Sequence, residues 1–376
     1  MKFEPDILIF KPKDIDLDYS PLRKDIQVET YVLGAFNPGF TRLPDGNLLM
    51  MVRVAEALKE PVFNGNIHTI RWSVEGYKLD SYPLEDVNTD DPRSFLIKYD
   101  LPSPLLGLTS LSWLLPVELS ADGLKIIKIH YDKIISPNRT SQEYGIEDAR
   151  ISQIDGKYYM TTCTVSSERH ATSLFSSDNG LNYSFKGIIL DHQNKDMLLF
   201  EGKAGGRYFA LTRPLGSLYF PTGKDSGFLP GPAINLAESP DLYHWKPTDH
   251  PFIRPKKGNM KTDRIGGGTP PILTNQGWLM LYHAVETSEK IGKYRTYWAL
   301  LNKDDPTEII RIEDKTPLLE ANPLLTENLA GSVYMDNVVF TTGIVDAGDH
   351  FIMASGEIDL ACRITHISKK VFGIEG

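Results

Sequence analysis

The stretch NQGWLMLYHAV (275–285) joins a glycine-bearing turn to an apolar run, and this pattern occurs five times along the chain. The other copies are PDGNLLMMVRV (44–54), IDGKYYMTTCT (154–164), GGRYFALTRP (205–214) and AGDHFIMASGE (347–357). Glycine suits a tight hairpin turn because it adopts positive φ at little cost. The runs are rich in β-branched and aromatic residues, and long helical patterns are nearly absent, so each copy is expected to form a turn and a strand.

Five such repeats predict an all-β fold, a five-bladed β-propeller whose four-stranded blades surround a central channel. We expect one catalytic domain over residues 1–376, with segment 1–33 supplying the strand that closes the last blade. The gap between the first two copies is the longest, so residues 85–140 are expected to carry extra strands or a long loop. A β-sandwich, or two separate β-domains, is the alternative that this patterning leaves open.

The composition is that of an ordinary globular protein of 376 residues, with 41% hydrophobic and 24% charged residues. Its 40 basic and 49 acidic residues give a net charge of −9, which argues against a nucleic-acid partner. Two cysteines cannot form a disulfide framework, and no close Cys/His grouping indicates a metal site. No apolar run reaches the ~18 residues of a membrane helix, and the N-terminus lacks a signal-peptide core. We therefore expect no membrane partner and a cytoplasmic location, or a periplasmic one if a leader was removed.

The motif YGIEDARI (144–151) carries the sharpest chemical signal, because it puts Glu147, Asp148 and Arg150 within four residues. An acid flanked by another acid and by an arginine is an arrangement that can tune a general acid. The alternative is a solvated turn with a surface ion pair.

Basic residues recur near the ends of the predicted strands. If the repeats line a channel, polar residues ending them face one pocket, and Arg53, Arg213, His283 and Glu357 lie at comparable offsets past the turns. Such a pocket indicates an anionic ligand such as phosphate, because a guanidinium offers a planar fork that suits it. A set of unrelated salt bridges is the alternative.

Taken together, the chain resembles glycoside hydrolase family 130, the β-mannoside phosphorylases and β-mannosidases. The similarity covers about residues 30 to 360 in collinear order. The matching stretches are FNPGF (36–40), LLMMVRVAE (48–56), GIEDARI (145–151), TVSSE (164–168), NKDMLLFEGK (194–203), YFALTRP (208–214), RIGGGTPPI (264–272), GWLMLYHAV (277–285) and DNVVFTTG (336–343).

The resemblance implies a five-bladed propeller and an inverting reaction on short β-mannosides, in which Asp148 is the catalytic acid. In the family's phosphorylases, phosphate attacks the anomeric carbon and mannose 1-phosphate forms. In its hydrolases a glutamate activates water, and Glu168 is our nominee for that base. Inorganic phosphate is then a co-substrate, and no metal or organic cofactor is implied. The implied phosphate-binding residues are Arg53, Arg150, Lys203, Arg213, Tyr282 and His283, and the implied sugar-binding residues are Asn37, Asp263 and Asp359.

Some positions depart from the family pattern. Ala149 stands where proline is usual, FEGK (200–203) replaces a Phe-Pro-Glu-Lys stretch, and Thr212 stands where many relatives have histidine. The retained basic residues favour phosphate as the acceptor. The changes lie near the expected phosphate-binding residues and favour water, so hydrolysis stays an alternative. Family members often form homo-oligomers, and the sequence fixes no symmetry for one.

Two hypotheses from other functional classes remain. One is a non-catalytic sugar-binding propeller, which would have no need of the acid in an intact Glu-Asp-x-Arg motif. The other is a furanosidase-type propeller enzyme, which would need three separated carboxylates around the channel. The repeats supply no clear set of that kind.

Overall fold

The computed structural model describes residues 4–91, 94–97, 105–215, 227, 231–256, 262–286 and 292–374. Over these ranges the fold is all-β, which confirms the fold class predicted from the sequence. Short 3-10 turns and one α-helix, α1 (Pro323–Thr326), are the helical elements of the described part. No helix within it is long and apolar enough to cross a membrane.

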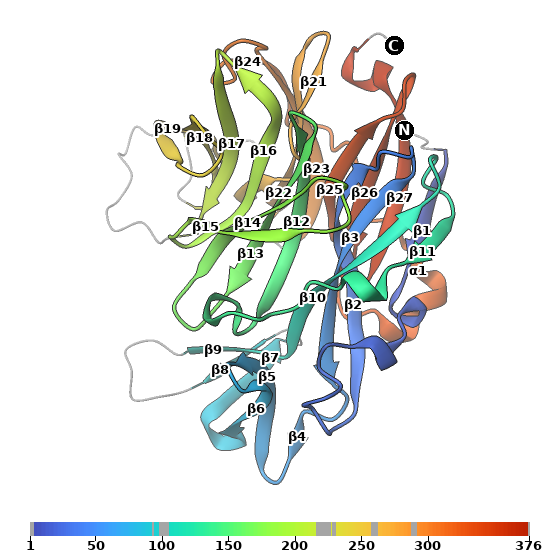
Figure 1. Ribbon diagram of the computed structural model, residues 1–376, viewed down its shortest axis with the longest axis vertical. Helices are drawn as coiled ribbons and strands as arrows, with labels where there is room; N and C mark the ends of the chain where they lie inside the picture. The colour runs from blue at the N-terminus through green and yellow to red at the C-terminus, as the bar shows by residue number, and fades with distance from the viewer. Residues whose placement is uncertain are drawn as a thin grey trace.

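Most strands fall into five groups of antiparallel paired strands, and most neighbours within a group are also consecutive in sequence (Figure 1). Group 1 holds β2 (Thr30–Arg42), β3 (Leu48–Leu58), β10 (Ser110–Leu119) and β11 (Ile126–Ile129). Group 2 holds β12 (Gly145–Ile154), β13 (Lys157–Val165), β14 (His170–Ser177) and β15 (Ser184–Leu190). Group 3 holds β16 (Asn194–Ala204), β17 (Arg207–Pro214), β18 (Ile234–Ser239) and β19 (Lys246–Ile253). Group 4 holds β20 (Thr262–Gly267), β21 (Ile272–Thr274), β22 (Gly277–Glu286), β23 (Lys293–Leu301) and β24 (Ile309–Glu313). Group 5 holds β25 (Val339–Asp346), β26 (His350–Glu357), β27 (Ala361–Ser368) and β1 (Asp6–Phe10).

The first strands of the groups lie against one another. β2 contacts both β12 and β25, β12 contacts β16, and β16 contacts β20. β25 in turn contacts β22 and β23 of group 4, so contacts run from each group to the next and return to group 1. Groups 1 and 2 are also joined into one eight-stranded sheet by a short parallel pairing between Ser112 and Gly145.

Both ends of the chain meet in group 5. β1 pairs antiparallel with β27 and is the outer strand of that sheet (Figure 1). The side chain of Arg363 is 3% exposed and contacts Asp6 at 2.7 Å and Glu357 at 2.9 Å. Burying a guanidinium is costly unless it is paired, so these contacts fix the N-terminal strand to β26 and β27.

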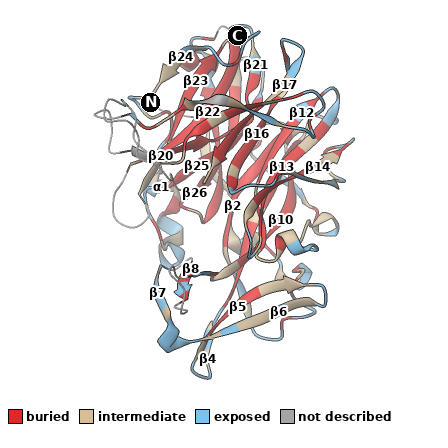
Figure 2. Cartoon of the chain, turned by 90° about the vertical axis from the view of Figure 1, so that its left-hand side faces the viewer, coloured by how far each residue is buried: buried red, intermediate tan, exposed pale blue. Residues whose placement is uncertain are grey.

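Two small sheets extend from group 1 at one end of the molecule (Figures 1 and 2). They consist of β4 (Val62–Phe63), β5 (Asn66–Ser73) and β6 (Gly76–Pro83), and of β7 (Val87–Asp91), β8 (Ser94–Ile97) and β9 (Leu105–Leu108). Both are inserted between β3 and β10, in the region where the sequence indicated extra strands.

The core lies between the sheets of the five groups, where Figure 2 shows a continuous buried zone. In β3, the run from Leu48 to Val52 is buried at every position rather than at alternate ones. A strand covered on both faces reads as a continuous apolar run, which explains why the five repeats are so apolar. Each repeat forms the strand that pairs with the first strand of its group: β3, β13, β17, β22 or β26.

Candidate active site

Residues from all five groups line one cavity of about 270 Å³. Its polar lining residues are Asn37, Arg53, Ser94, Ser110, Glu147, Asp148, Lys195, Asp196, Arg213, His283, Tyr294, Tyr334 and Asp359. Apart from His283, seven of them have acidic or basic side chains, so this cavity concentrates charge.

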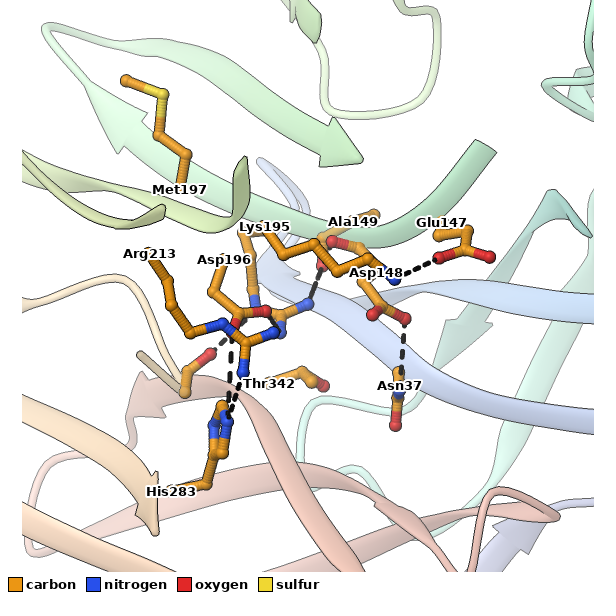
Figure 3. Close-up of polar contacts among 12 residues, drawn as sticks. Asn37, Glu147, Asp148, Ala149, Lys195, Asp196, Met197, Arg213, His283 and Thr342 are labelled. Atoms are coloured by element: carbon orange, nitrogen blue, oxygen red, sulfur yellow. Dashed lines mark hydrogen bonds and ion pairs between the residues drawn. The ribbon is translucent and has the colours of Figure 1, made fainter. Parts of the chain in front are cut away.

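Three polar side chains reach this cavity from irregular positions in the first strands. Asn37 in β2, Asp148 in β12 and Asp196 in β16 have φ of 46°, 51° and 53°. In each strand the register with its neighbour shifts at that point, which is the mark of a β-bulge. Non-glycine residues rarely adopt positive φ, and such strain is typical of functional sites. The same kind of β-bulge occurs in three neighbouring groups and brings an amide and two carboxylates together (Figure 3).

Asp148 lies at the centre of the polar contacts. Its Oδ1 accepts hydrogen bonds from Asn37 Nδ2 at 3.1 Å and from Arg53 at 3.0 Å. Burial alone would raise the pKa of this carboxyl, but the nearby charges of Arg53, Arg150 and Lys195 hold the pKa below its usual range. Asp148 is therefore a carboxylate in the ligand-free protein.

Glu147 anchors two of the cations. Its Oε1 accepts from Arg53 at 2.8 Å, and its Oε2 accepts from the Lys195 ammonium at 3.1 Å. Burial opposes its charge, yet the two cations keep the pKa of Glu147 below the ordinary value. An ammonium has three donors, and this contact uses one, so Lys195 keeps hydrogen-bonding capacity for a ligand.

Asp196, Arg213 and His283 form a second buried cluster. Asp196 lies 3.0 Å from Arg213 Nε and 3.6 Å from Arg150, and the Arg213 guanidinium donates to His283 Nε2 at 3.2 Å. Burial, together with the neighbouring arginines, holds the pKa of His283 well below its ordinary value. The imidazole is thus neutral, and its Nε2 accepts a hydrogen bond from Arg213 rather than competing with Arg213 for anions.

Comparisons with known proteins agree with this geometry. Residues 110–374 match the family model of glycoside hydrolase family 130, described as β-1,4-mannooligosaccharide phosphorylase. The chain is 34% identical to a β-1,2-mannobiose phosphorylase of Listeria innocua over 354 residues, 91% of this chain and 90% of the relative. It is 33% identical to a 1,2-β-oligomannan phosphorylase of a Thermoanaerobacter species, over 67% of this chain and 77% of that one.

The chain belongs to glycoside hydrolase family 130. A solved structure of the Listeria innocua β-1,2-mannobiose phosphorylase, in complex with β-1,2-mannobiose, superimposes with a TM-score of 0.78 and covers 98% of both chains. A putative glycosidase from Bacteroides thetaiotaomicron shares the fold, with a TM-score of 0.65 at 19% identity. The resemblance stated from the motifs is confirmed, and the protein is an enzyme of family 130.

Five of the residues predicted for the site line this cavity together with Asp148: Asn37, Arg53, Arg213, His283 and Asp359. Asp359 belongs to the turn after β26, has φ of 49°, and contributes its negative charge to the surroundings of Arg53. Asp263 belongs to β20, but its side chain lies outside the described residues.

Four other predicted residues do not line this cavity. Glu168, our nominee for the base, is on an exposed turn and contacts Arg169 at 3.0 Å. Lys203 lies at the far end of β16, exposed and beside the Tyr208 ring, so Lys195 of that strand lines the cavity and Lys203 does not.

Tyr282 faces the apolar core and donates its hydroxyl to the Glu313 carbonyl at 3.3 Å. The reason is geometric, because consecutive residues of a strand face opposite sides and only His283 can face the cavity. Arg150 is buried beneath the cavity and donates to the backbone carbonyls of Asp148 and Gly268, at 2.9 and 2.8 Å. It therefore holds the Asp148 bulge in place instead of lining the cavity.

Sequence reasoning missed Lys195 and Asp196 as site residues. Both occur in NKDMLLFEGK (194–203), where the correspondence with the family motif drew attention to Lys203 instead. A usable signal was present, since an acid precedes the apolar part of the strand in both EDAR and NKDM. Glu357, also singled out at a strand end, serves the Arg363 ion pair and not the cavity.

Proposed function

We propose that this family 130 enzyme is an inverting β-mannoside phosphorylase that converts short β-mannosides and inorganic phosphate to mannose 1-phosphate and a shortened sugar. The observation that carries the proposal is the placement of Lys195, Arg213 and His283 in the same cavity as Asp148. An ammonium and a guanidinium side by side suit a phosphate oxyanion. The named phosphorylases at 33–34% identity support the same reaction.

The arrangement of the five groups supports a specific architecture. We infer that the five groups are the blades of a five-bladed propeller, with β2, β12, β16, β20 and β25 as the innermost strands. The contacts that run from group to group and return to group 1 support this arrangement. The active site then lies at one end of the central channel, where the bulged strands converge. On this view the whole chain forms a single catalytic domain.

The chemistry requires a proton on Asp148, which the ligand-free protein does not hold. In our proposal phosphate enters as its monoanion, and its second proton passes to Asp148 as the dianion settles against Lys195 and Arg213. A phosphate oxygen then attacks the anomeric carbon while the bond to the leaving oxygen breaks. Asp148 returns the proton to that oxygen, directly or through a sugar hydroxyl. No metal or organic cofactor enters this scheme.

Hydrolysis is the competing reaction, and the geometry gives it less support. Inverting hydrolysis needs a second carboxylate free to activate water. Glu147 and Asp196 are both held in ion pairs, the charge of Asp359 interacts with that of Arg53, and Glu168 lies outside the cavity.

The test is to incubate the protein with β-1,2- and β-1,4-mannobiose, each with and without inorganic phosphate, and to measure mannose 1-phosphate and free mannose. The proposal predicts the sugar phosphate only when phosphate is present. Free mannose formed at the same rate in both conditions would show hydrolysis instead. An Asp148→Asn variant serves as the inactive control.

A further inference from the structure

The inserted sheet of β7, β8 and β9 supplies part of the active-site wall. Ser94 of β8 and Leu106 and Leu108 of β9 line the same cavity as the catalytic cluster. The other lining residues include apolar Leu33 and Met335 and polar Ser110 and Tyr334. Five of the seven charged lining residues belong to β12, β16 and β17, and the other two are Arg53 of β3 and Asp359 of the turn after β26.

Strand pairing explains which residues of the insertion face the cavity. Leu96 pairs with Leu106 across β8 and β9, and Ser94 pairs with Leu108, so these four share one face. The opposite face carries Phe95 and Ile97, which pack with Ile67 in a small core of their own. On that face the Phe95 ring lies where a side chain at Gly107 would be, so β9 needs a glycine opposite Phe95. Leu106 is nonetheless 57% exposed and Leu96 42% exposed.

The order of the groups decides which part of the substrate meets these leucines. Lys195 and Arg213 come from group 3 and His283 from group 4, whereas the insertion comes from group 1. The inner strand of group 1 lies between those of groups 2 and 5, so groups 3 and 4 are on the opposite side of the ring. In an inverting displacement the nucleophile and the leaving group occupy opposite faces of the anomeric carbon. Phosphate on groups 3 and 4 therefore places the leaving sugar toward group 1.

We propose that Leu106 and Leu108 of the β7–β9 insertion form the subsite for the leaving sugar, and that they bind it through the apolar face of its ring. The proposal rests on the proposed phosphorolysis. Aliphatic side chains bind a ligand more tightly as it covers more of their apolar area, and they do not discriminate between patterns of hydroxyl groups. The enzyme should therefore accept leaving groups of varied hydroxyl pattern, and should favour those with an apolar substituent such as a methyl or aryl glycoside.

The test uses the synthetic direction, in which mannose 1-phosphate and an acceptor sugar are joined and phosphate is released. We would measure the KM for the acceptor mannose and the KM for mannose 1-phosphate in wild type, Leu106→Ser, Leu106→Met and Leu105→Ser. Leu105 is the matched control, because it neighbours Leu106 on β9, is 48% exposed and faces the other side of the sheet.

We expect Leu106→Ser to raise the acceptor KM about three- to tenfold, the effect of losing part of one leucine's apolar contact area, and to leave the KM for mannose 1-phosphate within twofold. Leu106→Met should restore the wild-type value, and Leu105→Ser should change neither KM. An unchanged acceptor KM in Leu106→Ser overturns the inference, as does an equal effect of Leu105→Ser. A change of oligomeric state in Leu106→Ser with normal kinetics overturns it too, because a second copy of the chain would then cover the leucines. If wild type itself releases no phosphate, it is the proposed function that fails.

Discussion

Replacing Asp196 by asparagine should lower the stability of the protein and raise its affinity for phosphate. The Asp196 side chain is 1% exposed and lies between the guanidinium groups of Arg213 and Arg150, at 3.0 and 3.6 Å. Removing one partner of a buried ion pair costs about 3–5 kcal/mol. For a chain of 376 residues this loss corresponds to a fall in Tm of about 4–6 °C.

The same change should strengthen phosphate binding. A phosphate held on the far side of the Arg213 guanidinium would lie roughly 7 Å from the Asp196 carboxylate, where two like charges repel by about 2 kcal/mol at an effective dielectric constant of about 20. Because a ligand that binds only the native state stabilises it, saturating phosphate should raise the Tm of Asp196→Asn by about 3 °C more than that of wild type.

The assay is thermal unfolding at matched phosphate concentrations. Glu201→Gln is the control, because this carboxyl is on the same strand but at its far end, where burial raises the pKa of Glu201 to about 7. Phosphate should raise the Tm of Glu201→Gln by the same amount as that of wild type. Equal phosphate-induced shifts in Asp196→Asn and wild type would refute the placement of phosphate beside Arg213.

Three further outcomes are expected. Because the pKa of Asp148 lies below its ordinary value and its proton arrives with monoanionic phosphate, kcat/KM for phosphate should be flat from mildly acidic pH to neutrality. It should then fall about tenfold per pH unit above the second pKa of phosphate, whereas a rise across that range would contradict the scheme. In initial-rate assays Lys195→Ala should raise the KM for phosphate at least about tenfold, and Lys203→Ala should leave it unchanged. A larger effect of Lys203→Ala would mean that phosphate binds at the other end of β16. Arg363→Met should cost about 3–5 kcal/mol in denaturant unfolding and leave kcat/KM within about twofold; unchanged stability would mean that this ion pair does not hold the N-terminal strand.

The all-β class and the repeat strands could be predicted from the sequence, because turn glycines and apolar runs are local signals. Asp148, Arg53, Arg213 and His283 could be found for the same reason, since each stands in or beside such a run. The alternation of a strand also excluded Tyr282 once His283 faced the cavity, and this step was open to sequence reasoning.

Other parts of the site depend on features that no local pattern encodes. Lys195 and Lys203 are both basic residues of β16, eight positions apart, which is about 26 Å along a strand. Only the position of the bulge shows which of the two lies at the cavity. The position of Asp148 in the cavity and of Arg150 beneath it depends on the same kind of bulge, and bulges are set by packing between sheets. The approach of Leu106 to the cavity is a long-range contact between an insertion and the body of the fold.

The most direct measurement is NMR of the wild-type protein acting on β-1,2-mannobiose in phosphate buffer, following the phosphorus and anomeric proton signals of the first product. The account predicts mannose 1-phosphate in the α configuration, formed in equal amount to free mannose. The β configuration would contradict the inverting displacement, and two equivalents of mannose with no sugar phosphate would contradict phosphate as the nucleophile.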